Sequence, residues 1–253
     1  ERDSLMKILI VNPNTTLSMT HKIGVAARSV AAVGTEITAV SPEDGPVSIE
    51  GYYDEAFAVP GLLREIRKGE AQGMDGYIVA CFDDPGLHAA RSIATSPVVG
   101  ICEAAVYAVS MVAGSFTVVI TLRSSVPAIE KVVRGYGREN FCRRVRAADI
   151  PVLSLEEEGS EARLLIEDEI RRAADEDGAE VVVLGCAGTA DLTRQLTAKF
   201  GLPVIDGVAA AVKMVEGLVA QGLKTSKAGG YSPPPAKNYV GEFSGDGLVQ
   251  GGS

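Results

Sequence analysis

The sequence predicts an α/β fold with two Rossmann-like lobes, each a short parallel sheet flanked by helices, related by pseudo-two-fold symmetry. Short apolar segments rich in β-branched residues alternate with longer segments of helical periodicity along most of the 253 residues. This alternation is the order of a parallel sheet covered by helices. It starts again near residue 116 with landmarks at a near-constant offset, which indicates a duplicated unit of roughly 100 residues.

The first half is predicted to form four strands and four helices. Apolar runs give the strands, and segments with apolar residues at helical spacing give the helices. The elements expected in order are a strand over 7–11, a turn over 12–16 and a helix to about residue 30, a strand over 36–40, a loop over 45–54, a helix over 55–68, a strand ending at Ala80, a helix from Asp84 to about Thr95, a strand over 97–100 and a helix over 103–113. Asp84-Pro85 has the pattern of an N-cap followed by the first helical residue.

The second half repeats this order. The elements expected are a strand over 116–120, a turn over 121–127 with a helix to Tyr136, a short strand over 151–153, an amphipathic helix over 162–177, a strand over 179–184, a strand over 202–206 and a helix over 207–222. Glu161 in the first turn of the amphipathic helix and Gly178 just past its end are typical helix boundaries. The basic segment 143–146 is expected to be a solvated face.

The offsets between the halves support a duplicated unit. Cys81 and Cys186 are 105 positions apart (186 − 81), and Pro97 and Pro203 are 106 apart (203 − 97). We expect residues 6–110 and 209–240 to form the first lobe and residues 111–208 the second. The chain is rich in Gly, Pro and Ser from Ser226 onward, and we expect residues 241–253 to be a flexible tail.

Composition excludes several classes of partner. The net charge of −9 argues against nucleic-acid binding, and no apolar run reaches the roughly 18 residues that a membrane span needs. Only two histidines are present, and no CxxC pair, so no metal site is expected. The four cysteines, without a secretory signal, are expected to be free thiols in a reducing cytoplasm.

Cys81 and Cys186 occupy equivalent places in the two repeats. Each follows a buried strand and precedes a helix-start signal, at the sheet edge where open parallel sheets bind ligands. The alternative for a single cysteine is a buried small hydrophobe, which is the interpretation of Cys102 and Cys142. A pseudo-two-fold axis could place the paired thiols face to face across a cleft. A helix N-terminus directly after each cysteine would lower the pKa of its thiol.

Two facing thiols suit proton transfer at a carbon next to a carbonyl group. One thiolate removes the proton from one face, and the opposite thiol delivers a proton to the other face of the planar enolate. Asn14 and Thr121 follow the first strand of each half and could bond a ligand, or only form turns. Asp83 is either a solvated loop acid or a site residue, and Ile49 either an apolar wall or ordinary loop packing.

The same motifs resemble those of the hydantoin and allantoin racemases, in the aspartate/glutamate racemase superfamily. The resemblance covers about residues 6–239 and is carried by four segments: Asn12-Pro13-Asn14-Thr15-Thr16, Ser48-Ile49-Glu50 with Tyr53-Asp54-Glu55-Ala56, Ala80-Cys81-Phe82-Asp83-Asp84-Pro85-Gly86-Leu87 and Gly185-Cys186-Ala187-Gly188. It implies that Cys81 and Cys186 are the acid–base catalysts, one for each enantiomer. It also implies a homo-oligomer, no cofactor and no metal. The residues implied to hold the substrate ring are Asn14, Thr121, Phe82, Asp83, Ala187 and Gly188.

Two positions depart from the family pattern. Cys102 stands where a glycine is expected, which would bring a third thiol near the cleft, and Thr189 stands where methionine is more usual. The resulting hypothesis is racemisation at C5 of 5-monosubstituted hydantoins. The alternatives are allantoin racemisation, another reaction of the superfamily such as amino-acid racemisation or cis–trans isomerisation, and a two-lobed small-ligand binding protein. A purely structural role is the weakest, because it leaves the paired cysteines unexplained.

Overall fold

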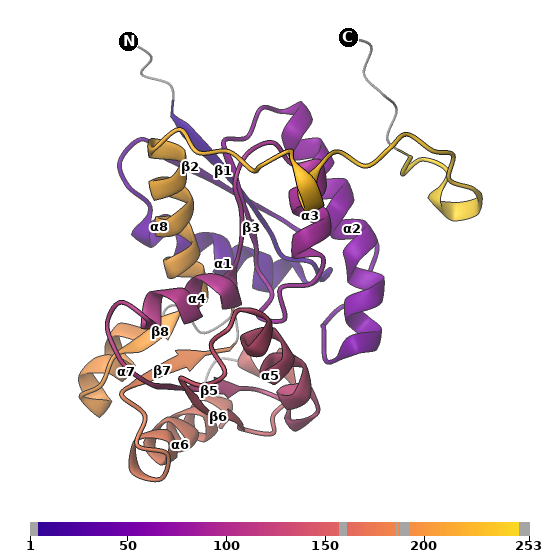
Figure 1. Ribbon diagram of the computed structural model, residues 1–253. Coiled ribbons are helices and arrows are strands. Elements are labelled where there is room, and N and C mark those ends of the chain that lie inside the picture. The colour runs from indigo at the N-terminus through magenta and orange to yellow at the C-terminus, as the bar shows by residue number, and fades with distance from the viewer. Residues whose placement is uncertain (1–4, 157–160, 186, 188–192, 248–253) are drawn as a thin grey trace.

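The computed structural model describes residues 5–156, 161–185, 187 and 193–247 and confirms the predicted fold class. Two four-stranded sheets have the orders β2-β1-β3-β4 and β6-β5-β7-β8, and every strand pairing in them is parallel. Each strand of the second sheet occupies the place of the strand four positions earlier in the first sheet, as a duplication requires. Figure 1 shows the two sheets in separate lobes, each flanked by helices.

The first half contains β1 (Met6–Val11), α1 (Leu17–Val30), β2 (Thr35–Val40), α2 (Tyr52–Ala71), β3 (Gly76–Val79), α3 (Leu87–Ile93), β4 (Val98–Gly100) and α4 (Ile101–Val109). The second half contains β5 (Phe116–Ile120), η1 (Arg123–Ser125), α5 (Val126–Gly135), β6 (Cys142–Ala147), η2 (Val152–Glu156), α6 (Ala162–Asp175), β7 (Val181–Leu184), α7 (Thr193–Phe200), β8 (Val204–Asp206) and α8 (Gly207–Ala220). Two short 3-10 helices follow, η4 (Gly229–Tyr231) and η5 (Gly241–Phe243).

One apolar core joins the two lobes. It combines fully buried residues of β1 and β3 with others from β5 and β7, and it includes Cys102 of α4 and Val212 of α8. The helix α4 connects the two sheets along the chain and packs against α8, which also packs against β3 and α1 of the first lobe. In Figure 1, α4 lies at the junction of the lobes. The described residues contain no helix that is both long and apolar enough to cross a membrane.

The prediction of the second strand in the second lobe was wrong. Residues 152–156 form the 3-10 helix η2, and the strand is β6, in the basic segment assigned to a solvated face. The strand lies at the edge of its sheet. Arg146 is only 4% exposed because three carboxylates surround it, with Nε 2.6 Å from Asp177, Nη2 2.8 Å from Glu176 and Nη1 3.2 Å from Glu169.

The helix predicted to start at Asp84 starts three residues later, at Leu87, and Asp84 does not cap it. Asp84 has φ of +45° and Gly86 has φ of +67°, both in the left-handed region that no first helical turn adopts. These two positions end the loop after β3 and redirect the chain. The lobe boundaries and the mobility of the tail remain predictions; in the structure Asp246 forms an ion pair with Arg64 of α2, at 2.8 Å.

Candidate active site

Cys81 lies in a tight turn at the carboxyl end of β3. The Ala80 N–H donates to the Val11 carbonyl group and continues the β1–β3 pairing up to the cysteine. The Asp84 N–H then donates to the Cys81 carbonyl group at 3.0 Å and closes a four-residue turn. The backbone at Cys81 is therefore held at the sheet edge by hydrogen bonds on both sides of the residue.

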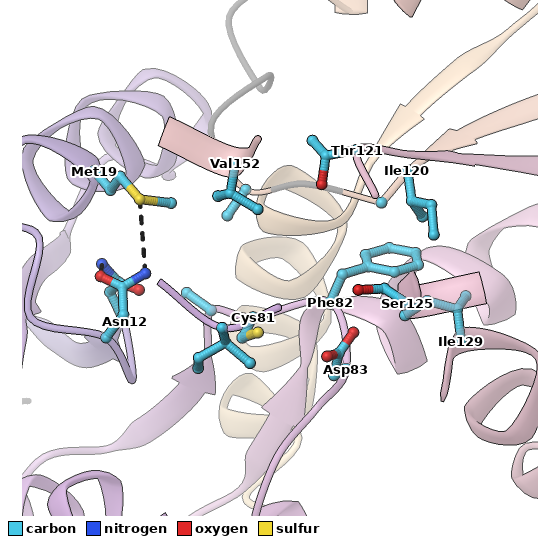
Figure 2. Close-up of a pocket in the computed structure, with 15 residues that line it drawn as sticks. Asn12, Met19, Cys81, Phe82, Asp83, Ile120, Thr121, Ser125, Ile129 and Val152 are labelled. Carbon is cyan, nitrogen blue, oxygen red and sulfur yellow. Dashed lines mark hydrogen bonds between the residues drawn. The ribbon is translucent and has the colours of Figure 1, made fainter. Parts of the chain in front are cut away.

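A pocket between the lobes surrounds this turn (Figure 2). The first half contributes Asn12, Asn14, Met19, Ile49, Ala80, Cys81, Phe82 and Asp83, and the second half contributes Ile120, Thr121, Ser125, Ile129, Val152, Gly185 and Ala187. In Figure 2, Asn12 and Met19 lie on one side of Cys81, and Ile120, Ser125 and Ile129 lie on the other. A ligand here would touch the carboxyl edges of both sheets.

The structure brings together the predicted site residues that it describes. These are Asn14, Ile49, Cys81, Phe82, Asp83, Thr121 and Ala187. Cys186 and Gly188 lie outside the described residues. Met19, Ile129 and Val152 were not foreseen, because they come from the first turns of helices and from η2, where the sequence shows only ordinary apolar periodicity.

The orientation of the Asn14 amide is set by its neighbours. The oxygen Oδ1 accepts from the Thr16 backbone N–H and from the Asn12 side-chain nitrogen, each at 2.9 Å. A backbone N–H can only donate, so Oδ1 and not the nitrogen must face Thr16. The Asn14 nitrogen is left facing Met19 Sδ at 3.6 Å, a weak acceptor. The pocket therefore receives an uncharged N–H donor.

Burial raises the pKa of the Cys81 thiol well above its usual range, and the nearby Asp83 carboxyl adds to the shift, although the Asp83 backbone N–H opposes it by bonding the sulfur. The helix expected directly after Cys81 to lower this pKa begins at Leu87, so that expectation was wrong. Burial and the carboxyl group of Glu55, which shares a hydrogen bond with Asp83, raise the pKa of Asp83. Protonation of Asp83 removes its negative charge from beside the Cys81 sulfur.

Residues 8–215 match the family described as Asp/Glu/Hydantoin racemase. The chain belongs to this family. It is 52% identical over 236 residues to the hydantoin racemase of Rhizobium meliloti, covering 93% of this chain and 98% of the relative.

Two solved structures are also similar to this chain. The allantoin racemase of Klebsiella pneumoniae is 48% identical with a TM-score of 0.93, covering 94% of this chain and 98% of that one. The allantoin racemase of Pseudomonas fluorescens is 38% identical with a TM-score of 0.90, covering 93% and 100%. These relatives confirm the predicted isomerase class, a racemase.

In this racemase the third thiol does not reach the pocket wall. Cys102 is fully buried in α4 and is not among the residues that line the pocket. Its backbone N–H instead donates to the Asp84 carboxylate, at 3.2 Å. His88 is exposed on α3, and its Nδ1 lies 2.8 Å from the Tyr231 hydroxyl group.

Proposed function

We propose that this racemase interconverts D- and L-5-monosubstituted hydantoins by proton transfer between Cys81, C5 of the ring and Cys186, without a cofactor. The observation that carries the proposal is that Cys81 shares one pocket with Gly185 and Ala187, the residues on either side of Cys186 in the sequence. The hydantoin racemase at 52% identity supports the substrate class.

In the proposed reaction one thiolate removes the C5 proton. The bonding pair left on carbon moves into the neighbouring carbonyl group, whose oxygen becomes an enolate. The opposite thiol then donates its proton to the other face of C5, the carbonyl group re-forms, and the two sulfurs have exchanged roles. Each turnover moves one proton onto one sulfur and one proton off the other, so the charge of the pair is unchanged.

The surroundings of Cys81 favour its protonated form, because burial raises the pKa of this thiol. Cys81 then acts first as the acid, and the enantiomer whose C5 proton faces Cys186 reacts with the resting form. Asn14 supplies the donor for a ring carbonyl oxygen, and its hydrogen bond strengthens as charge develops there. Thr121, after the equivalent strand of the second lobe, offers a hydroxyl group on the other side.

Allantoin is the second candidate substrate, because the structures at 48% and 38% identity are named allantoin racemases. Its C5 substituent is a polar ureido group. The pocket wall contributed by Ile49, Ile120, Ile129 and Val152 is apolar, and an apolar wall leaves the ureido N–H and C=O groups without partners. We therefore place substituted hydantoins with apolar groups first.

The test uses the purified protein with L-5-benzylhydantoin in deuterated water, with no added cofactor. The C5-H signal and the optical rotation are followed together, against a control without enzyme because such hydantoins racemise slowly unaided. Loss of both signals with the enzyme supports the proposal, and allantoin added as a competitor ranks the two substrates. Exchange without loss of rotation would contradict two-base transfer, and no change in either signal would move the assignment to allantoin.

A further inference from the structure

The Asp84 carboxylate joins three segments behind the pocket. The residue is 7% exposed. Its Oδ1 accepts from the Cys102 N–H at 3.2 Å, and its Oδ2 accepts from the Glu103 N–H at 2.8 Å and from the Tyr136 hydroxyl group at 2.6 Å. Cys102 and Glu103 belong to the first turn of α4, and Tyr136 follows α5. All three donors come from outside the four-residue turn over 81–84, the cysteine turn.

These donors connect the cysteine turn to both lobes. Asp84 closes the Cys81 turn through its backbone N–H. Its side chain also bonds the first turn of α4, the helix between the sheets, and Tyr136 at the end of α5. The helix α5 carries Ile129, and Ser125 precedes it; both line the opposite side of the pocket. The Asp84 carboxylate thus adds a hydrogen-bonded link between the Cys81 turn and the second lobe to the apolar core that joins the lobes.

The local backbone is arranged around this carboxylate. Asp84 has φ of +45°, a conformation that costs a non-glycine residue energy and persists only where the surroundings hold it. A Cβ atom added at Gly100 would clash with the Asp84 carboxylate, so only glycine lets the carboxylate reach the start of α4. The side-chain hydrogen bonds, the positive φ of Asp84 and the absence of a Cβ atom at Gly100 all favour the contact between the Asp84 carboxylate and the start of α4.

We infer that Asp84 is a positioning residue for the racemisation, which aims the Cys81 sulfur at C5 by tying its turn to α4 and, through Tyr136, to α5. The inference rests on the proposed function. It makes a prediction that a purely structural role does not make: loosening Asp84 impairs the half of the reaction that uses Cys81 and largely spares the half that uses Cys186.

The experiment measures C5-H exchange in deuterated water, at low conversion, for each enantiomer of 5-benzylhydantoin separately. A two-base racemase that lacks one base can still exchange the enantiomer whose proton faces the remaining base. The Cys81→Ser variant therefore identifies the enantiomer that depends on Cys81. In Asp84→Asn, exchange of that same enantiomer should fall roughly 10- to 100-fold, and exchange of the other by at most about threefold, since a shift of about 1 Å can cost 100-fold.

Two further variants complete the test. Tyr136→Phe keeps the carboxylate and its two backbone donors, so it should give the same asymmetry at smaller size, whether or not Asp84→Asn folds well. Glu216→Gln is the matched control, because the Glu216 carboxylate is also buried and accepts a backbone N–H, that of Ala32 at 2.7 Å, away from the pocket. It should leave the ratio of the two exchange rates unchanged.

The outcomes separate the two proposals. Equal losses for both enantiomers in Asp84→Asn and Tyr136→Phe, with a normal one-sided loss in Cys81→Ser, would overturn the positioning role and leave the proposed function standing. Absence of exchange in the wild type, or unchanged exchange of both enantiomers in Cys81→Ser, would overturn the proposed function and the inference with it.

Discussion

Replacing Asp84 by asparagine removes a buried carboxyl group whose charge changes with pH. Burial raises its pKa from 3.8 to about 7, although the Tyr136 hydroxyl and the Glu103 and Cys102 N–H groups oppose the shift. Glu103 is the charged group facing it from α4 and adds to the shift, while its own carboxylate pairs with Arg91 at 2.5 Å. The folded protein therefore holds a proton here at pH 5 that the unfolded chain has lost.

The sign and size of the pH effect follow from this difference. The folded protein holds this proton and the unfolded chain does not between the unfolded-state pKa of 3.8 and the folded-state pKa of about 7, so stability falls as the pH rises across this window. Between pH 5 and pH 8 the wild-type protein should lose about 1.4 kcal/mol per pH unit up to the folded-state pKa near 7 and little beyond it, or about 3 kcal/mol in all. The asparagine side chain of the variant cannot ionise, and its poorer hydrogen bonding costs the same at both pH values.

The assay compares the melting temperatures of the wild type and Asp84→Asn at pH 5 and pH 8. The difference between the two proteins should shift in favour of the variant by about 6–12 °C, at about 2–4 °C per kcal/mol for a chain of this size. Glu216→Gln serves as the control, because the folded-state pKa of Glu216 is lowered and its removal should not favour the variant at high pH. A difference that stays constant between the two pH values would refute a protonated Asp84 at pH 5.

Three further substitutions have expected outcomes. Asn14→Asp replaces the N–H donor with a charged acceptor and should lower kcat about 100- to 1,000-fold in polarimetry; an unchanged kcat would contradict the donor role. Gly185→Ala puts a Cβ atom 2.4 Å from Ile120 Cγ2 and should cost about 1–3 kcal/mol in urea unfolding; an unchanged urea midpoint would contradict this close packing. Arg146→Met leaves the buried Asp177 and Glu169 carboxylates without this cation and should cost about 3–5 kcal/mol. The Arg144 side chain is 60% exposed, and Arg144→Met should cost under about 1 kcal/mol. Equal costs would refute the buried cluster.

The duplication was predictable because the same local sequence patterns occur in both halves of the chain. Apolar β-branched runs mark β1, β3, β5 and β7, a small residue follows β3 and β7, and the same strand order then appears in both sheets. The strand β6 could not be predicted in this way. It carries Arg143, Arg144 and Arg146, and the burial of Arg146 depends on carboxylates up to 31 positions later in the sequence. Only the tertiary fold brings these charges together.

The candidate site also combines residues that the sequence could predict with one whose role it could not. Residues within three positions after a strand, such as Cys81, Asn14 and Thr121, could be placed from topology, because parallel strands present their carboxyl ends at one edge. The role of Asp84 could not be read locally. The sequence Asp84-Pro85 has a capping pattern, yet its carboxylate caps α4, 18 and 19 positions onward. A short-range signal was correct about the chemistry of the residue and wrong about its partner.

The two-thiol mechanism is tested most directly by Cys81→Ser and Cys186→Ser, assayed separately with each enantiomer of 5-benzylhydantoin in deuterated water. The mechanism predicts that both variants lose racemisation and that each keeps C5-H exchange of one enantiomer only, the opposite one in the two variants. Racemisation at a near-wild-type rate in either variant would contradict the central role of the cysteine pair.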